Sequence, residues 1–213
     1  MGRRPVTFFF TIILGLAAAL STAAFAETPP PSHSPDIPVR DGDIIFHRSL
    51  TQQAAAIAAA THSEFTHMGV IFIEDGKPYV YEAVQPVGKA PLDEWIKRGD
   101  KEHYVIKRLK DPSKLDTVAL KKEVTTMLGK NYDWLFEWSD DSIYCSELVW
   151  KGYERASGIK LGELRTLKDL DLSHAAVQKI LKERYGDKVP YEMEVICPCD
   201  VFSSTLLETV ETK

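Results

Sequence analysis

The chain has 213 residues, of which 44% are hydrophobic and 27% charged, and its formal net charge at pH 7 is −5. This length is sufficient for one domain with a sizeable core. An acidic balance without a basic cluster argues against a nucleic-acid partner, and against binding anionic lipid headgroups by charge alone.

The first 26 residues have the layout of a cleaved secretory signal. Two arginines in "MGRRPVT" precede an apolar run of 13 residues, "FFFTIILGLAAAL", and the segment then ends in small residues, Ala24 and Ala26. The run is short for a membrane anchor, although an uncleaved anchor is the alternative. We expect cleavage after Ala26 and a periplasmic or secreted protein without stable membrane insertion. Loss of Arg3 and Arg4 would take the net charge from −5 to −7.

Residues 27–40, "ETPPPSHSPDIPVR", contain five prolines and few apolar side chains, which is typical of an extended tether or of disorder. A single folded domain is expected over residues 41–213. It opens with "DGDIIFH", which predicts a turn and a short strand. The alanine-rich stretch that follows predicts a helix, with Ser49 and Gln52 at the spacing of a capping box.

The clearest hairpin lies in "THMGVIFIEDGKPYVYEAV", where two β-rich runs flank an Asp-Gly pair. If Asp75 and Gly76 form the turn, Gly69 lies opposite Glu82. His67 is then the diagonal neighbour of Glu82 on the same face of the sheet, at a separation that longer side chains can bridge. A register shifted by one residue would place His67 and Glu82 on opposite faces.

The rest of the chain mixes helices and strands without regular alternation. We expect a short helix in "PLDEWIKR", a strand in "EHYVIKRL", and a helix in residues 111–130 with Pro112 near its start and Gly129 at its end. An aromatic loop over residues 131–141 precedes a helix that opens near Cys145 and stops at Gly158. A further helix in residues 173–186 and a last strand with a closing loop complete the domain. This order predicts an α+β fold with an antiparallel sheet.

Three cysteines in an oxidising compartment leave at least one unpaired. Cys197 and Cys199 flank a single proline, where a direct disulfide would be strained, and bridges from Cys145 to either one are formally allowed. A redox role for Cys197 and Cys199 is conceivable, but one residue separates them, whereas the usual dithiol motifs have a two-residue spacer. Two sulfurs without a histidine cluster are a weak metal site. We therefore expect Cys197 and Cys199 to be structural, and we expect no metal and no cofactor.

The sequence allows two roles for Cys145, one structural and one as a nucleophile. A free cysteine is most often a small buried hydrophobe on the inner face of its helix. Cys145, however, stands in the first turn of a predicted helix, where unpaired N–H groups stabilise a thiolate and can hold an oxyanion. A nucleophile also needs an oriented base. The hairpin offers His67 as that base and Glu82 as the acid that orients it.

Other side chains carry weaker signals. Tyr132 and Tyr144 precede Cys145, and each has either a hydroxyl for the oxyanion or substrate or a buried packing role. Glu147 is explained by the helix dipole alone. The three remaining aromatic residues of the loop either pack in the core or form a groove wall for an acyl chain: Trp134, Phe136 and Trp138. Three histidines are expected at the surface or in packing: His47, His62 and His103.

Three segments in this order resemble the YiiX-like proteins: "DGDIIFHRSLTQQAAAIAAATHSEFTHMGVIF", "YVYEAV" and "GKNYDWLFEWSDDSIYCSELVW". These proteins are a circularly permuted branch of the NlpC-type papain-like hydrolases, related to the lecithin retinol acyltransferase group. The resemblance spans about residues 41–205, and its motifs, among them His-x-Gly and Tyr-Cys-Ser-Glu, are specific in combination and occur in the expected order. It implies a permuted papain-like fold, an antiparallel sheet or barrel packed against helices. Permutation also explains why His67 lies 78 residues before Cys145.

The resemblance further implies a cysteine peptidase or amidase that acts on an amide or ester bond. Position by position, Cys145 is the nucleophile, His67 the base and acid, and Glu82 the orienting acid. Transfer to an acceptor instead of water is an open alternative, and the substrate is either a cell-wall peptide or an N-acyl or lipid-like molecule. A catalytically idle binding module of the same fold is the alternative from another class. The sequence does not indicate the oligomeric state.

Overall fold

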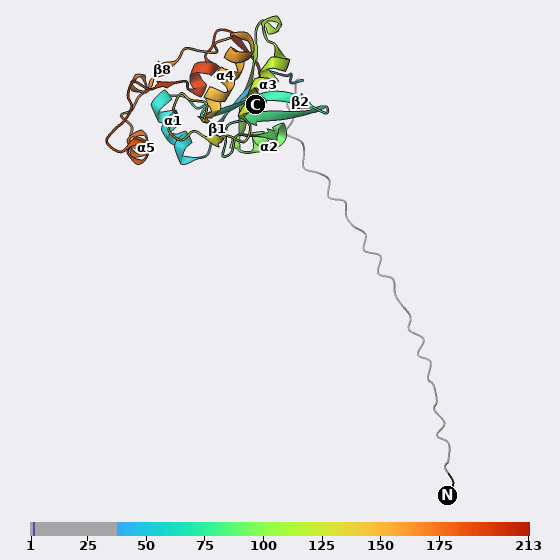
Figure 1. The fold of residues 1–213 in the computed structure, drawn as a ribbon, viewed down its shortest axis with the longest axis horizontal. Coiled ribbons are helices and arrows are strands. Elements are labelled where there is room, and N and C mark those ends of the chain that lie inside the picture. Colours follow the sequence, from blue (N-terminus) through green and yellow to red (C-terminus); the bar gives the residue numbers. More distant parts are fainter. Residues whose placement is uncertain (1, 3–37) are drawn as a thin grey trace. The chain divides into compact units, whose positions relative to one another are not determined.

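A six-stranded antiparallel sheet forms the centre of the fold, with strand order β10-β5-β1-β2-β3-β4 (Figure 1). The computed structural model describes residue 2 and residues 38–213, so the expected signal segment and most of the expected tether lie outside the described residues. The strands of this sheet are β1 (Ile44–Ser49), β2 (His67–Glu74), β3 (Lys77–Glu82), β4 (Gly88–Pro91), β5 (Gly99–Leu109) and β10 (Leu207–Thr212). Four two-residue strands form two small sheets: β6 (Asn131–Tyr132) with β7 (Ser142–Ile143), and β8 (Arg165–Thr166) with β9 (Glu194–Val195).

Helices cover both faces of the large sheet. They are α1 (Gln52–Thr61), α2 (Leu92–Lys97), α3 (Thr117–Met127), α4 (Cys145–Ser157), α5 (Ala175–Tyr185) and α6 (Pro198–Phe202), with 3-10 turns at Pro112–Lys114 and Leu167–Asp169. Side chains alternate along β1: Ile44 and Phe46 belong to the core that α4 completes, whereas Ile45 belongs to the core beneath α2. Because a strand's successive side chains point to opposite faces, a sheet buried on both sides reads as a continuous apolar run.

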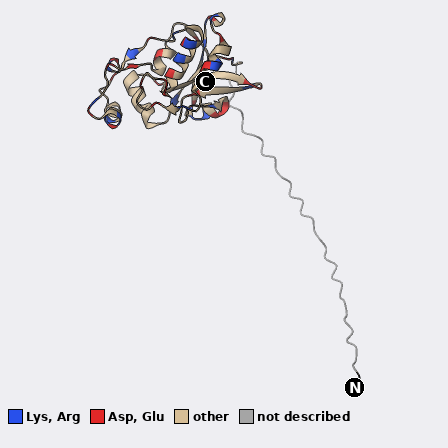
Figure 2. Ribbon diagram, in the orientation of Figure 1, with Lys and Arg blue, Asp and Glu red and all other residues tan. Residues whose placement is uncertain are grey.

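A third apolar cluster lies away from the sheet, where α1 packs on α5 (Figure 1). It includes Ala56 and Ala60 from α1 and Val177 and Leu181 from α5. No residue of α1 is charged, and the helix is uniformly tan in Figure 2, whereas α2, α3, α4 and α5 carry charges of both signs. In the described residues, no helix is both long and apolar enough to cross a membrane.

The hairpin forms in the predicted register, with Glu74 paired to Lys77 and Val70 paired to Tyr81. The helix in "SLTQQAAAIAAAT" starts later than predicted. Ser49 ends β1, and the side chain of Thr51 caps α1 by accepting the Ala54 N–H at 3.1 Å. Thr51 is the cap because its hydroxyl stands three residues before the Ala54 N–H, the spacing at which an N-cap side chain reaches an unpaired backbone donor.

Two other boundaries differ from the prediction. Pro112 opens a separate 3-10 turn, and α3 begins at Thr117 because the carboxylate of Asp116 accepts the Ala119 N–H at 2.9 Å. The sequence predicts a closing loop after the last strand, but residues Leu207–Thr212 form a further strand, β10, which pairs with β5. The expected end of the cysteine helix is confirmed: Gly158 closes α4 in the left-handed region, with φ of 68°.

Candidate active site

Cys145 is the first residue of α4 and is buried, with 3% of its surface exposed. The helix starts at this point because the Glu147 carboxylate accepts the backbone N–H of Tyr144 at 3.2 Å. Glu147 therefore has a specific capping contact beyond the dipole effect that the sequence suggested. The free N–H groups of the first turn face the region of the thiol, where they favour negative charge on sulfur or on a bound oxyanion.

His67 opens β2, and Glu82 closes β3, so the hairpin holds both at one end of the sheet. His67 Nε2 lies 2.6 Å from Oε2 of Glu82. Gly69 makes this pairing possible: a Cβ atom at residue 69 would lie 2.5 Å from Cγ1 of Val80, too close for any side chain. The diagonal relationship that the sequence predicted is thus present.

Glu82 is 2% exposed and receives two further hydrogen bonds from the α2 region. Trp95 Nε1 donates to Oε2 at 2.9 Å, and the Arg98 guanidinium donates to Oε1. Burial alone would raise the pKa of Glu82, but the hydrogen bond from His67 and the attraction of His67 and Arg98 outweigh it and lower the pKa to about 2. The carboxylate is therefore ionised throughout the physiological pH range.

The Cys145 thiol is close enough to His67 to raise the pKa of the imidazole. Because Nε2 is hydrogen-bonded to Glu82, Nδ1 is the ring nitrogen available to the sulfur. Burial lowers the pKa of His67, but the hydrogen bonds and charge interactions with Cys145 and Glu82 together raise it to about 10. The geometry thus favours an imidazolium held between a carboxylate and a thiol, which is the arrangement that activates a cysteine nucleophile.

Trp95 and Arg98 are site residues that the sequence interpretation missed. His47 stacks on the Trp95 indole with ring centroids 3.9 Å apart, and its own pKa is lowered to about 2, mainly by burial and next by the charge of His67. His47 is thus a neutral packing residue, as expected. The segment "PLDEWIKR" predicts a helix, which is present as α2. The contact of this helix with Glu82 arises because β4 pairs with β3 and carries the chain back toward Glu82, and the local sequence does not encode this pairing.

The two candidate tyrosines take different positions. The Tyr132 hydroxyl accepts a hydrogen bond from Gln53 Nε2 at 2.7 Å, so its proton is free to point elsewhere. Burial and then the proximity of Cys145 raise the pKa of Tyr132 far above its ordinary value, which keeps the phenol neutral. The Tyr144 hydroxyl instead accepts the Ile196 N–H at 3.2 Å. Tyr132 is therefore a neutral hydroxyl that interacts electrostatically with Cys145 and can donate a hydrogen bond. Tyr144 instead holds the backbone at Ile196.

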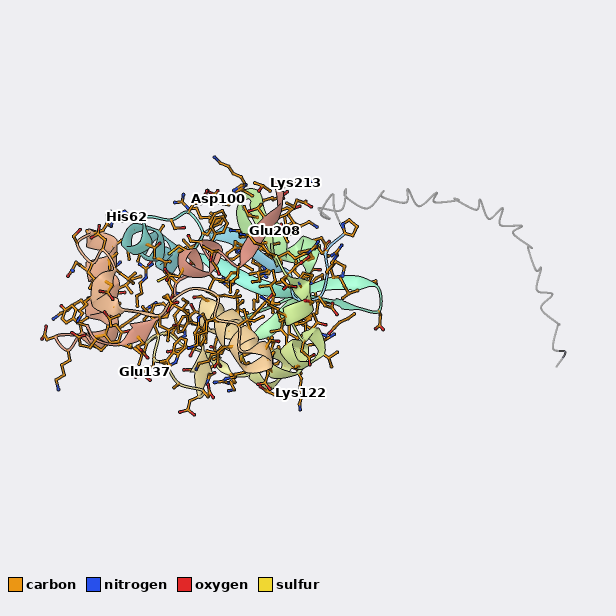
Figure 3. The ribbon with its side chains drawn as sticks, turned by 90° about the horizontal axis from the view of Figure 1, so that it is seen from above. His62, Asp100, Lys122, Glu137, Glu208 and Lys213 are labelled. Carbon is orange, nitrogen blue, oxygen red and sulfur yellow. The ribbon has the colours of Figure 1, made fainter. Side chains whose placement is uncertain are left out.

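The loop aromatics divide between the two roles that the sequence left open. Trp138 packs edge-on against Trp150 at 5.4 Å, which is a packing role. Trp134 and Phe136 line cavities beside the site. His62 is exposed, and His103 is half-buried and stacks on Phe65, in agreement with the expected surface or packing roles. His62, at the end of α1 in Figure 3, forms an ion pair with Asp171 at 3.0 Å, and His103 contacts the Lys213 carbonyl oxygen.

Two cavities meet at the site. An open cleft of about 610 Å³ contains His67 and Arg98, and a smaller apolar cavity of about 90 Å³ contains Cys145. Gln53, Ile57 and Tyr132 line both and therefore lie at the junction. Cys145 thus lines the apolar cavity, and His67 lines the more polar cleft.

The three cysteines are free thiols. Among the described residues, Cys197, Cys199 and Asp200 are the group with metal-ligand atoms close together, within 4.8 Å. Both carboxylate oxygens of Asp200 are already engaged, Oδ1 by the Arg165 guanidinium and Oδ2 by the Cys197 N–H at 2.8 Å. Two remaining sulfurs fall short of the four ligands of a structural zinc site. The donor set therefore falls short of a closed, four-ligand structural zinc site.

Residues 38–211 match the family of permuted papain-like amidase enzymes, YaeF/YiiX, C92 family. The uncharacterized protein YiiX of Escherichia coli (strain K12) is 43% identical over 199 residues, which cover 93% of this chain and 94% of YiiX. A crystal structure of the metalloprotein YiiX from Escherichia coli O157:H7 is similar, with a TM-score of 0.78 and 44% identity over 82% of this chain and 97% of that chain. The expected family and the α+β permuted papain-like fold are confirmed.

Proposed function

Because the chain belongs to the C92 family of permuted papain-like amidases, we propose that Cys145, His67 and Glu82 form a catalytic triad that cleaves an amide or ester bond. The observation that carries the proposal is the 2.6 Å contact between Glu82 and His67, together with the interaction of Cys145 at the start of α4 with the same imidazole. A buried, ionised acid, an oriented imidazole and a thiol at a helix N-terminus are the parts that nucleophilic acyl transfer requires.

The reaction follows from these contacts. The Cys145 thiol gives its proton to His67, and the sulfur adds to the substrate carbonyl carbon. The resulting oxyanion accepts hydrogen bonds from N–H groups of the first turn of α4 and from the Tyr132 hydroxyl. His67 gives its proton to the leaving nitrogen or oxygen as the bond to carbon breaks, which leaves a thioester on Cys145. His67 then takes a proton from water, the hydroxide attacks the thioester, and the acid product leaves as the thiol is restored. An amine or alcohol in place of water would make the same enzyme an acyltransferase.

Surrounding residues hold the triad in this state. Trp95 and Arg98 share the oxygens of Glu82, and His47 packs the indole from the other side. Such supporting contacts fix the orientation of a catalytic imidazole and stabilise its charged form. Burial of the Glu82 charge carries a desolvation cost, which its three hydrogen-bond donors offset. An inactive binding module would have no need for this costly arrangement, so it favours an enzyme.

Trapping of the acyl-enzyme tests the proposal. Wild-type protein and Cys145→Ala are incubated with activated esters of short and long acyl chains, and the intact mass is measured. We expect an increase equal to one acyl group on the wild type and no increase on Cys145→Ala, with the label on the peptide that contains Cys145. Labelling of both proteins, or of neither, would favour the idle binding module.

We also propose that the protein is exported. The support is the layout of residues 1–26, with arginines, an apolar run and a small-residue end before the proline-rich segment. An enzyme with a reactive thiol would then work in the cell envelope or outside the cell.

A further inference from the structure

Cys197 and Cys199 lie on either side of Pro198, where α6 begins. Their sulfur atoms and a carboxylate oxygen of Asp200 lie within 4.8 Å of one another. Pro198 is the first residue of the helix, and helical Cα atoms two residues apart are separated by about 5.4 Å, within the range of about 4.4–6.8 Å that disulfides span. The two thiols can therefore form a bond with little movement of the backbone.

The two thiols differ in exposure and in acidity. Cys197 is buried, with 8% of its surface exposed, whereas Cys199 is half-buried. The hydrogen bond between the two thiols lowers the pKa of Cys199, although burial opposes this shift. The same hydrogen bond raises the pKa of Cys197, and burial raises it further. Cys199 is therefore the sulfur that ionises first and that a reagent can reach, and Cys197 remains a neutral thiol beside it.

Arg165 supplies the positive charge at this pair. Its strand β8 pairs with β9, with Arg165 opposite Val195, which brings the guanidinium to the start of α6. The guanidinium donates to Oδ1 of Asp200, and Oδ2 accepts the Cys197 N–H at 2.8 Å. Both contacts compensate the negative charge of Asp200, whose Oδ1 lies 3.8 Å from the Cys199 sulfur. A guanidinium beside a thiol favours the thiolate, which is the reactive form of cysteine.

We propose that Cys197 and Cys199 form a redox-active dithiol that reacts with organic disulfides, with Cys199 as the attacking thiol and Cys197 as the thiol that closes the ring. This site is separate from the triad, and the inference does not rest on the proposed acyl transfer. A permanent structural disulfide is the alternative. A ring with a single residue between its cysteines carries strain, and strained disulfides are readily reduced. The pair therefore changes reversibly between a dithiol and a disulfide.

The exchange proceeds in two steps. The Cys199 thiolate attacks one sulfur of the external disulfide, so a mixed disulfide forms and one thiolate leaves. Cys197 then loses its proton to solvent and attacks the Cys199 sulfur, which breaks the mixed disulfide and releases the second thiolate. The two cysteines give up two electrons and two protons, and the external disulfide takes them up as it becomes two thiols.

Full-length Cys145→Ala protein tests the pair without the proposed nucleophile, because Cys197 and Cys199 are then the remaining cysteines of the chain. The protein is equilibrated with mixtures of reduced and oxidised glutathione in the presence of a chelator, quenched with acid, and labelled with iodoacetamide in denaturant. Its intact mass is then measured. We expect two labels with excess reduced glutathione. With excess oxidised glutathione we expect no label and a mass lower by two hydrogens, and added reductant should reverse the change. Two labels in every mixture, or two stable glutathione adducts without ring closure, would overturn the proposal.

Single substitutions in the same background separate the two thiols. Cys197→Ser should accept one glutathione on Cys199 and keep it, because the thiol that closes the ring is absent. Cys199→Ser should react at least about tenfold more slowly, since Cys197 is buried and protonated. In urea the two variants should react at similar rates, because the difference arises from the fold. Equal rates in the folded variants would show that Cys199 is not the attacking thiol.

The role of Arg165 is tested on the Cys145→Ala, Cys197→Ser protein. Arg165→Gln should slow the addition of glutathione to Cys199 at pH 7 about threefold to tenfold and shift the rate profile to higher pH, because the cation beside the thiolate is lost. Arg165→Lys should restore part of the rate. Lys168→Gln is the matched control, because Lys168 is a nearby cation that pairs with Glu192, and it should leave the rate unchanged. If Arg165→Gln reacts as fast as Lys168→Gln, Arg165 does not activate the thiol and the proposed site is wrong.

Discussion

The Nε2 atom of His67 lies 2.6 Å from Oε2 of Glu82, although the two residues belong to different strands and are not directly paired. The contact depends on two features of the hairpin. Its register sets the two residues diagonally on one face, and Gly69 leaves the space between them open. The hairpin thus brings an acid and a base together on one face of the sheet, and the hydrogen bonds from Trp95 and Arg98 hold the acid there.

Replacement of His67 by Ala should slow alkylation of Cys145 at pH 6.5 and reduce turnover at least about a hundredfold, because the cation beside the sulfur and the proton donor are both lost. Iodoacetamide labelling of wild-type and His67→Ala proteins, followed by mass spectrometry across pH 5–10, measures the first effect. Cys145→Ser should keep the fold and lose activity. If the two labelling curves coincide, Cys145 is an ordinary buried cysteine.

Much of this arrangement could be predicted from the sequence, because it depends on local rules. The Asp-Gly turn fixes the hairpin register, and Gly158 and the Cys145 segment fix the bounds of α4. Trp95 and Arg98 could not be found in this way, since they reach Glu82 through a tertiary return of the chain that no local pattern encodes. The same holds for the cavity between α1 and α5, helices more than a hundred residues apart. The permutation was suggested only by family resemblance.

Acid should selectively remove the stability that Glu82 provides. Its pKa is lowered to about 2 in the folded protein, below the ordinary 4.5, so its contribution is present above pH 4.5 and is lost as the pH falls toward 2. The pKa of His67 is raised, so its contribution is present below pH 6.5 and is lost as the pH rises toward 10. Urea unfolding of wild type and Glu82→Gln should therefore differ at pH 7 and converge near pH 2.5. A difference that does not change with pH would mean that Glu82 acts only through packing.

Trp95→Phe removes the Nε1–H donor to Glu82 and keeps most of the ring that stacks on His47. A lost hydrogen bond to a buried charge costs about 1.5–3 kcal/mol, and we expect lower kcat with nearly unchanged KM, because the indole does not touch substrate. The pH profile of kcat should also shift, since a less firmly held carboxylate stabilises the imidazolium less. Trp138→Phe is the control, because that indole packs on Trp150 away from the triad. Equal effects of the two substitutions would show a general packing defect.

Export should be visible as processing at the N-terminus. Expression of the full chain in a bacterium should yield a periplasmic protein that begins at Glu27, because small residues at Ala24 and Ala26 follow the apolar run. N-terminal sequencing after osmotic-shock fractionation measures both features. Recovery of Met1 in the membrane fraction would instead identify the run as an uncleaved anchor.

The two tyrosines before Cys145 should respond differently to loss of their hydroxyls. Tyr132→Phe removes a neutral donor that lines the same cavity as Cys145, so kcat should fall about tenfold to a thousandfold. The unfolding free energy should change little, because the half-buried Gln53 side chain can donate to water instead. Tyr144→Phe leaves the Ile196 N–H without its acceptor, so it should cost about 1–3 kcal/mol of stability and affect kcat much less. Steady-state kinetics and urea unfolding on both variants separate the roles. If Tyr132→Phe keeps wild-type kcat, the oxyanion is held by the backbone of α4 alone, and the Tyr132 hydroxyl serves only to position Gln53.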